Sequence, residues 1–143
     1  MSNIGSYEER LKNFTWSLAS NELDYKDGQV INIGWYCSDR ICLQGKADKK
    51  ALHYEGMGGV TKSYSFNDIR LASNTIGTFL SSLGIRNEDR VCLFMDRIPE
   101  LYLSFLGVLK IGAIVQPLFS AFGDESLFIR LEFLGGVKVI KHN

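Results

Sequence analysis

The amino-acid sequence predicts an α/β fold: a partial layered domain with a mostly parallel sheet of at least three parallel strands, preceded by an amino-terminal arm and a β-hairpin. Short apolar runs of strand length recur at residues 91–95, 113–116 and 137–140. The segments between them have the apolar spacing of helices, and glycine or proline stands at most of the boundaries. Strand–helix–strand units of this length are right-handed and parallel in nearly all known cases.

The composition is that of a globular protein with the size of one domain. The chain has 143 residues, of which 45% are hydrophobic and 22% are charged. Its 16 basic and 16 acidic residues balance, so neither nucleic acid nor an anionic membrane is indicated as a partner. No stretch approaches the roughly 20 apolar residues of a membrane span, and the amino terminus lacks a signal pattern. We therefore expect a cytoplasmic protein.

Residues 1–50 are interpreted as an amino-terminal arm and linker, and residues 51–143 as the α/β part. Phe14, Trp16 and other apolar residues before position 30 are too many for a free tail, so we expect the arm to pack onto another surface. A short helix is expected over residues 32–40. The polar, lysine-rich segment 44–50 is typical of a linker.

A β-hairpin is predicted for residues 51–64. Two short runs with strand propensity, 51–54 and 60–64, flank a turn that contains three glycines. A glycine-rich phosphate loop needs a helix directly after it, whereas a strand follows here. The glycines therefore indicate a turn and not a phosphate site.

A long amphipathic helix is predicted after the hairpin. Ser65 is placed to cap it, with Asp68 at the reciprocal position of a capping box. Gly84 is expected to end the helix. Its apolar stripe consists of Phe66, Ile69, Ala72, Ile76, Phe79, Leu80 and Leu83.

The central unit is a strand at 91–95, a helix at 99–110 and a strand at 113–116. Pro99 suits the first helical position, and Pro117 is expected to stop the second strand. The helix should be buried nearly all round, with only Tyr102, Ser104 and Lys110 reaching water. A further helix at 124–134 and a strand at 137–140 complete the order.

No nucleophile, catalytic residue or metal site is predicted from the residues themselves. His53 and His142 have no cysteine or serine partner nearby in the sequence, and the three cysteines lack the spacing of a disulfide or zinc framework. Asp96 and Arg97 follow the first parallel strand, where open α/β sheets bind ligands. A local salt bridge or helix cap is the alternative interpretation of this pair.

Two segments resemble the core motifs of the AMP-forming acyl-CoA synthetases, within the larger family of adenylate-forming enzymes. Residues 64–69 resemble the first motif, a tyrosine-led segment that opens a helix. Residues 109–118 resemble the second, in which Lys-x-Gly-Ala leads into a strand ending in proline. Further similar segments are residues 84–91, 99–101 and 130–131, and the acetyl-CoA synthetase branch is indicated by residues 32–33, 39–40 and 117–122.

The resemblance implies a two-step ligation in which acetate attacks ATP to give acetyl adenylate and pyrophosphate, and the CoA thiol then displaces AMP. ATP, Mg²⁺ and CoA are therefore the ligands of the full-length family. The phosphate loop, the acyl pocket and the carboxyl-terminal domain with its catalytic lysine have no counterpart in this sequence. We expect an amino-terminal fragment that is inactive alone and binds no cofactor, in which Lys110 belongs to the second motif.

The resemblance also implies one residual ligand site. Phe119, Ser120, Ala121 and Phe122 correspond to a turn near the CoA channel of the acetate-type relatives. The alternative is a packed aromatic turn with both phenylalanines in the core.

An incomplete family domain should expose apolar surface. We therefore expect self-association or binding to the remaining portion of a synthetase. The alternative function is that of a non-enzymatic interaction module, which binds a complete synthetase or another partner.

Overall fold

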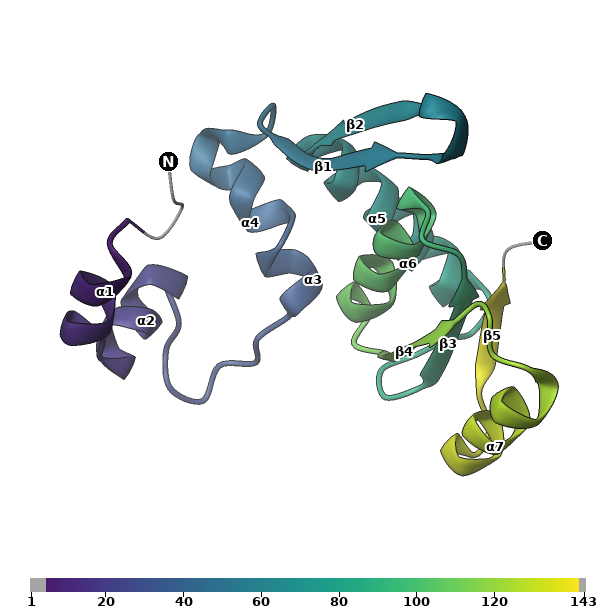
Figure 1. Cartoon of the computed structure of the whole chain (residues 1–143). Helices are drawn as coiled ribbons and strands as arrows, with labels where there is room; N and C mark the ends of the chain where they lie inside the picture. Colours follow the sequence, from purple (N-terminus) through teal and green to yellow (C-terminus); the bar gives the residue numbers. More distant parts are fainter. Residues whose placement is uncertain (1–4, 142–143) are drawn as a thin grey trace. The chain divides into compact units, whose positions relative to one another are not determined.

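The computed structural model describes residues 5–141, and the chain forms two compact units that divide between Ile31 and Asn32 (Figure 1). The first unit contains helices α1 (Tyr7–Asn13) and α2 (Trp16–Leu23). The hydroxyl of Ser6 caps α1 and that of Thr15 caps α2. Neither helix has a buried residue, so the packing of the arm onto another surface stays a prediction.

The second unit begins with short helices and the hairpin. The single helix expected over residues 32–40 is instead two, α3 (Ile33–Tyr36) and α4 (Asp39–Ile41), followed by the π-helical turn η1 (Cys42–Lys46). The antiparallel pairing of β1 (Lys50–Glu55) with β2 (Thr61–Ser65) confirms the hairpin. The 3₁₀ turn η2 (Met57–Gly59) joins the two strands.

Helix α5 (Phe66–Ser82) begins at the predicted capping box. The Ser65 hydroxyl accepts a hydrogen bond from the Asp68 N–H at 3.1 Å, and the Ser65 N–H donates to the Asp68 carboxylate at 2.8 Å. The Ser65 hydroxyl, which donates to the Asp68 carboxylate at 2.7 Å, and the Ser65 N–H together hold the pKa of Asp68 below its ordinary value. Gly84 follows the helix with a positive φ of 86°, which a glycine adopts without strain.

The predicted parallel sheet is confirmed. Strands β3 (Arg90–Met95), β4 (Ile114–Phe119) and β5 (Lys138–Lys141) lie in the order β4-β3-β5, and both pairings are parallel. Helix α6 (Pro99–Lys110) connects β3 to β4, and helix α7 (Asp124–Leu134) connects β4 to β5.

The expectation that Pro117 stops the second strand is wrong, because β4 continues through it to Phe119. Pro117 pairs with Leu93 of β3 in the parallel register. Proline lacks an N–H group and is tolerated where a strand has only one neighbour. β4 is such an edge strand among the described residues, with β3 on one side of it.

The core lies between β3 and the helices α5 and α6. Val91 and Leu93 of β3 and Val108 of α6 have no exposed surface, and Leu80, Ile85 and Ala113 complete the buried cluster. The two helices pack closely, since a Cβ added to Gly107 would lie 3.0 Å from the Ser73 carbonyl oxygen and 2.9 Å from a methyl carbon of Ile76.

The two crossover helices belong to opposite faces of the sheet. The β3–α6–β4 connection moves from the central strand to one edge, whereas β4–α7–β5 returns past the centre to the other edge. Right-handed connections that run in opposite directions place their helices on opposite faces. Figure 1 shows α7 away from the α5–α6 pair.

Two residues of α6 are less exposed than the sequence suggested. Tyr102 is exposed as expected, but Ser104 is buried and the Lys110 side chain is only 9% exposed. The expectation that Ser104 and Lys110 reach water is therefore wrong, because α3 and α5 both cover this helix.

Among the residues that the structure describes, no helix has the length and apolar character needed to cross a membrane.

Candidate functional site

The carboxyl ends of β3 and β4 form the candidate ligand end of the sheet. Met95 and Phe119 are paired at these ends. The chain then leaves β3 toward α6 and leaves β4 toward α7, on opposite faces. Open α/β sheets bind ligands in the crevice at such a switch point. The sequence placed Asp96 and Arg97 at a strand end, and the strand order now places the turn after Phe119 beside them.

The turn after β4 carries the four residues assigned to a residual CoA site. The Phe122 N–H donates to the Phe119 carbonyl at 3.0 Å, which closes the turn over Ser120 and Ala121. The two phenylalanine rings meet edge to face with centroids 5.8 Å apart. Phe119 is 52% exposed and is not a core residue, whereas Phe122 is half-buried.

Two arginines contact the aromatic rings of this turn. The Arg130 guanidinium from α7 lies 4.1 Å from the Phe122 ring centroid. Arg97, directly after β3, lies 6.0 Å from the Phe119 ring centroid. Cation–π contacts of this kind contribute about 0.5–1 kcal/mol at exposed sites. Arg97 thus connects the two strand ends across the switch point.

A pocket of about 650 Å³ lies beside the end of β3. Its walls come from the β1–β2 hairpin and from the connection between β3 and α6. The lining residues are Tyr54, Gly56, Met57, Val60 and Lys62 on the first wall, and Asp96, Arg97 and Ile98 on the second.

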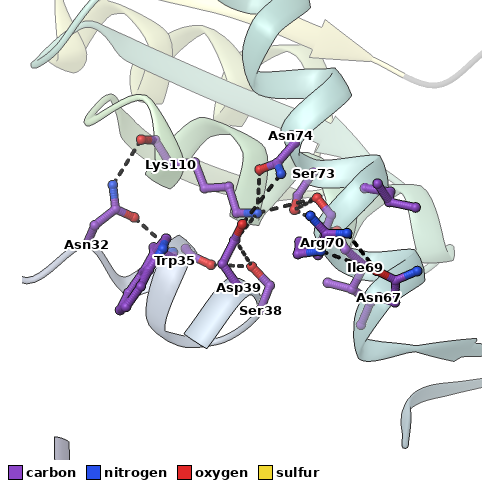
Figure 2. A network of polar contacts seen from close by, with 12 residues as sticks. Asn32, Trp35, Ser38, Asp39, Asn67, Ile69, Arg70, Ser73, Asn74 and Lys110 are labelled. Carbon is purple, nitrogen blue, oxygen red and sulfur yellow. Dashed lines mark hydrogen bonds and ion pairs between the residues drawn. The ribbon is translucent and has the colours of Figure 1, made fainter. Parts of the chain in front are cut away.

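A polar network joins α3 and α4 to the long helices (Figure 2). The Lys110 ammonium forms an ion pair with Asp39 at 2.5 Å and donates a hydrogen bond to the Asn74 side chain at 2.7 Å. Asn32 donates to the Lys110 carbonyl at 2.9 Å and accepts from the Trp35 N–H at 3.0 Å. Lys110 of the second motif therefore has a positioning role in this structure.

The network lowers the pKa of Asp39. Burial by itself raises the pKa of this carboxyl group, but hydrogen bonds from Lys110, Ser38 and Asn74, together with the Lys110 charge, outweigh burial. Sequence reasoning missed this network because the two charges lie far apart in the chain and no local pattern connects them.

The other reactive side chains do not converge. His53 is exposed and its Nδ1 lies 3.0 Å from the Ser63 hydroxyl, whereas His142 lies outside the described residues. Cys92 is buried, as a core cysteine should be, and burial raises the pKa of its thiol. Within residues 5–141, no group of three or more His, Cys, Asp or Glu side chains is arranged to hold a metal ion.

The chain resembles adenylate-forming enzymes in sequence. The family model for AMP-binding enzymes matches residues 40–140. The acetyl-coenzyme A synthetase of Bacillus subtilis is 36% identical over 131 residues, which cover 91% of this chain and 23% of the relative. That of Streptomyces coelicolor is 28% identical over 139 residues, which cover 90% and 21%. The chain thus spans less than a quarter of the length of these relatives.

The chain also resembles solved structures. A Brucella canis acyl-CoA synthetase aligns with a TM-score of 0.82 at 30% identity, over 94% of this chain and 24% of that one. The Klebsiella oxytoca NpsA N-terminal subdomain, in complex with 3-hydroxyanthranilyl-AMSN, aligns with a TM-score of 0.66 at 23% identity. The second likeness, over 73% of this chain, supports the fold alone.

The Asp39–Lys110 pair predicts a loss of stability in acid. Because the folded state lowers the pKa of Asp39, its contribution is full above the unfolded value of about 3.9 and is lost as the pH falls through the folded value. Asp39→Asn should flatten this dependence. At pH 7 it should lower the free energy of unfolding by about 3 kcal/mol, since Lys110 stays nearly buried without a carboxylate.

Urea denaturation between pH 3 and 7 measures both effects. Asp48→Asn, at an exposed position, is the matched control and should stay within about 0.5 kcal/mol of the wild type. Equal pH dependence in the wild type and Asp39→Asn would show that the pair contributes nothing.

Proposed function

This chain belongs to the AMP-binding enzyme family, and we propose that it is the amino-terminal portion of an AMP-forming acetyl-CoA synthetase. The match of 36% identity to the Bacillus subtilis enzyme supports the acetate-type assignment. In the proposed full-length protein, acetate and ATP give acetyl adenylate and pyrophosphate, and CoA then displaces AMP. The proposed compartment is the cytoplasm, which the three free cysteines favour.

Within that reaction, the proposed role of this chain is to form one wall of the CoA channel at the switch point between β3 and β4. The observation that carries this role is the Phe119–Phe122 turn, which presents a half-exposed aromatic ring beside Arg97. An aromatic face and a guanidinium are suited to a ligand that combines a purine ring with phosphates. Ser120 and Ala121 form the middle of the turn that the Phe122–Phe119 hydrogen bond closes, where the backbone can approach such a ligand.

The adenylation step itself is not assigned to these residues. It needs donors for the triphosphate, carboxylates for Mg²⁺ and a cation directed at the developing charge. The described residues offer Mg²⁺ no cluster of ligands, and the sequence has no glycine-rich loop that leads into a helix with a lysine.

We expect the 143 residues alone to show no adenylation. Loss of one oxyanion donor costs about 100-fold or more in comparable sites, so loss of all the phosphate contacts should leave only background. The measurement is acetate-dependent exchange of labelled pyrophosphate into ATP by the purified chain. A full-length acetyl-CoA synthetase is the positive control, and exchange that co-purifies with the chain through two orthogonal columns would contradict the expectation.

A second candidate function is that of an interaction module. Helix α7 exposes Phe128, Ile129 and Phe133, the last of them 90% exposed. Large apolar side chains gathered on one helix are typical of a surface that another protein covers. The proposed occupant is a complete synthetase or a second copy of this chain.

Association through α7 should depend on Phe133. The chain should elute from gel filtration as a concentration-dependent oligomer, or together with a full-length synthetase, and Phe133→Ser should reduce this association at least several-fold. Tyr102→Ser, which changes an exposed aromatic residue on α6, is the matched control. A sharp monomer peak at all concentrations, with no co-elution and no effect on synthetase activity, would remove this candidate.

A further inference from the structure

We propose that a second pocket, between the α3–α4 segment and the start of α5, is a binding site for a small aromatic monocarboxylate. Its volume of about 350 Å³ lies within the range of about 300–1,000 Å³ for small-molecule sites. It shares no lining residue with the pocket beside β3 and none with the Phe119–Phe122 turn. The site therefore goes beyond the proposed function and does not depend on it.

The walls of this pocket belong to segments that hydrogen bonds join. Trp35 of α3 and Asp39 of α4 form one wall. Asn67 and Arg70 of α5 form another, and Figure 2 shows them across the polar network from the first wall. The turn η1 and Ala47 close a third side, where the Ala47 carbonyl accepts from the Asn67 N–H at 3.0 Å. The pocket is thus built into the second unit.

Arg70 supplies the uncompensated charge of the pocket. Its Nε and Nη2 groups donate to the Asn67 side-chain oxygen at 3.3 and 2.8 Å, which fixes the plane of the guanidinium. The ion pairs found within residues 5–141 are Arg10–Glu22 and Asp39–Lys110, so Arg70 has no carboxylate partner there. The edge formed by Nη1 and Nη2 remains for a ligand. Such a fork matches the two oxygens of a planar carboxylate.

Asp39 limits the charge of the occupant. Its carboxylate pairs with the Lys110 ammonium and accepts from the Ser38 hydroxyl at 2.9 Å, so the charges of Asp39 and Lys110 neutralise each other. The net charge at the pocket is then that of Arg70. One positive charge matches one carboxylate, whereas a phosphate dianion would bring a second negative charge toward Asp39.

Trp35 and Leu43 supply apolar surface for the body of the occupant. Trp35 is 39% exposed and Leu43 is 78% exposed, and both line the pocket. The indole of Trp35 is a flat surface on which another aromatic ring can stack. A carboxylate without an apolar group, such as acetate, would leave both side chains in water. The lining therefore favours an aromatic ring that carries one carboxylate.

Alkylation of Cys42 reports whether the pocket is occupied. Cys42 is half-buried and lines the pocket, whereas Cys37 is exposed at the end of α3 and is the internal control. After reaction of the 143-residue chain with iodoacetamide, trypsin cleaves at Arg40 and separates the two cysteines for mass spectrometry. Benzoate at ten times its dissociation constant should slow alkylation of Cys42 about tenfold, because only the free chain reacts there. Alkylation of Cys37 should not change.

Three further probes separate the contribution of the charge from that of the ring. Benzyl alcohol keeps the ring but lacks the charge, and it should bind about tenfold more weakly than benzoate without the charge-assisted hydrogen bonds to Arg70. Acetate lacks the ring and inorganic phosphate lacks the ring and carries more charge. Neither should protect Cys42 at the concentration at which benzoate does, with the ionic strength held constant.

Variants assign the carboxylate to Arg70. Arg70→Gln should weaken benzoate binding about tenfold and leave benzyl alcohol binding unchanged, whereas Arg70→Lys should retain part of the benzoate affinity. A purely structural role of Arg70 would weaken both probes alike. Arg86→Gln changes an exposed arginine after α5 and should bind benzoate as the wild type does. Trp35→Leu should weaken both probes, because it removes the ring that they stack on.

The outcomes decide the proposal. Protection of Cys42 by benzoate that is lost in Arg70→Gln would support it. Absence of protection up to the solubility limit of sodium benzoate, or equal slowing at Cys37, would overturn the site. Equal binding of benzoate and benzyl alcohol by the wild type, or protection by acetate or phosphate as strong as that by benzoate, would overturn the assignment to an aromatic monocarboxylate.

Discussion

The structure of the second unit depends on the burial of the central residues of β3. Val91, Cys92 and Leu93 have no exposed surface, and the strand has a parallel neighbour on each side. A strand buried on both faces must have helices over both faces, which parallel crossovers supply. Because β3 is central and its two neighbours follow it in the chain, the crossovers run in opposite directions. The switch point, and with it the pairing of Arg97 with the Phe119 turn, follows from this strand order.

A second constraint fixes the segment before the hairpin. The Asp39–Lys110 pair, with Asn74 and Asn32, joins α3 and α4 to helices that come much later in the sequence. Gly34 allows this approach, since a Cβ there would lie 2.7 Å from the Leu106 carbonyl oxygen. The desolvation of the two charges is offset by their attraction and by the amide hydrogen bonds, so the network specifies position more than it adds net stability.

Helix starts, which depend on neighbouring residues, could be predicted from the sequence. Contacts between residues far apart in the sequence could not. Pro99 at the first helical position predicted the start of α6, and Ser65 with Asp68 predicted the start of α5. The predicted end of β4 was wrong, because a strand tolerates a proline such as Pro117 when it lies at the edge of the sheet. The strand order decides this position. The burial of Ser104 and Lys110 depends on α3 and α5, which no periodicity within α6 reveals. The sequence placed Arg97 at the end of a strand but did not predict its contact with Phe119, because the strand order brings these two residues together.

The central claim is that CoA meets this chain at the carboxyl ends of β3 and β4. Paramagnetic broadening of amide signals by CoA that carries a spin label on its thiol tests this claim most directly, because it reports which end of the sheet the ligand approaches. Strong broadening is expected at residues 96–98 and 119–123 and little at Arg90 and Ile114, which are paired at the amino ends of the same strands. Broadening that is equal at both ends, or stronger at Arg90 and Ile114, would contradict it.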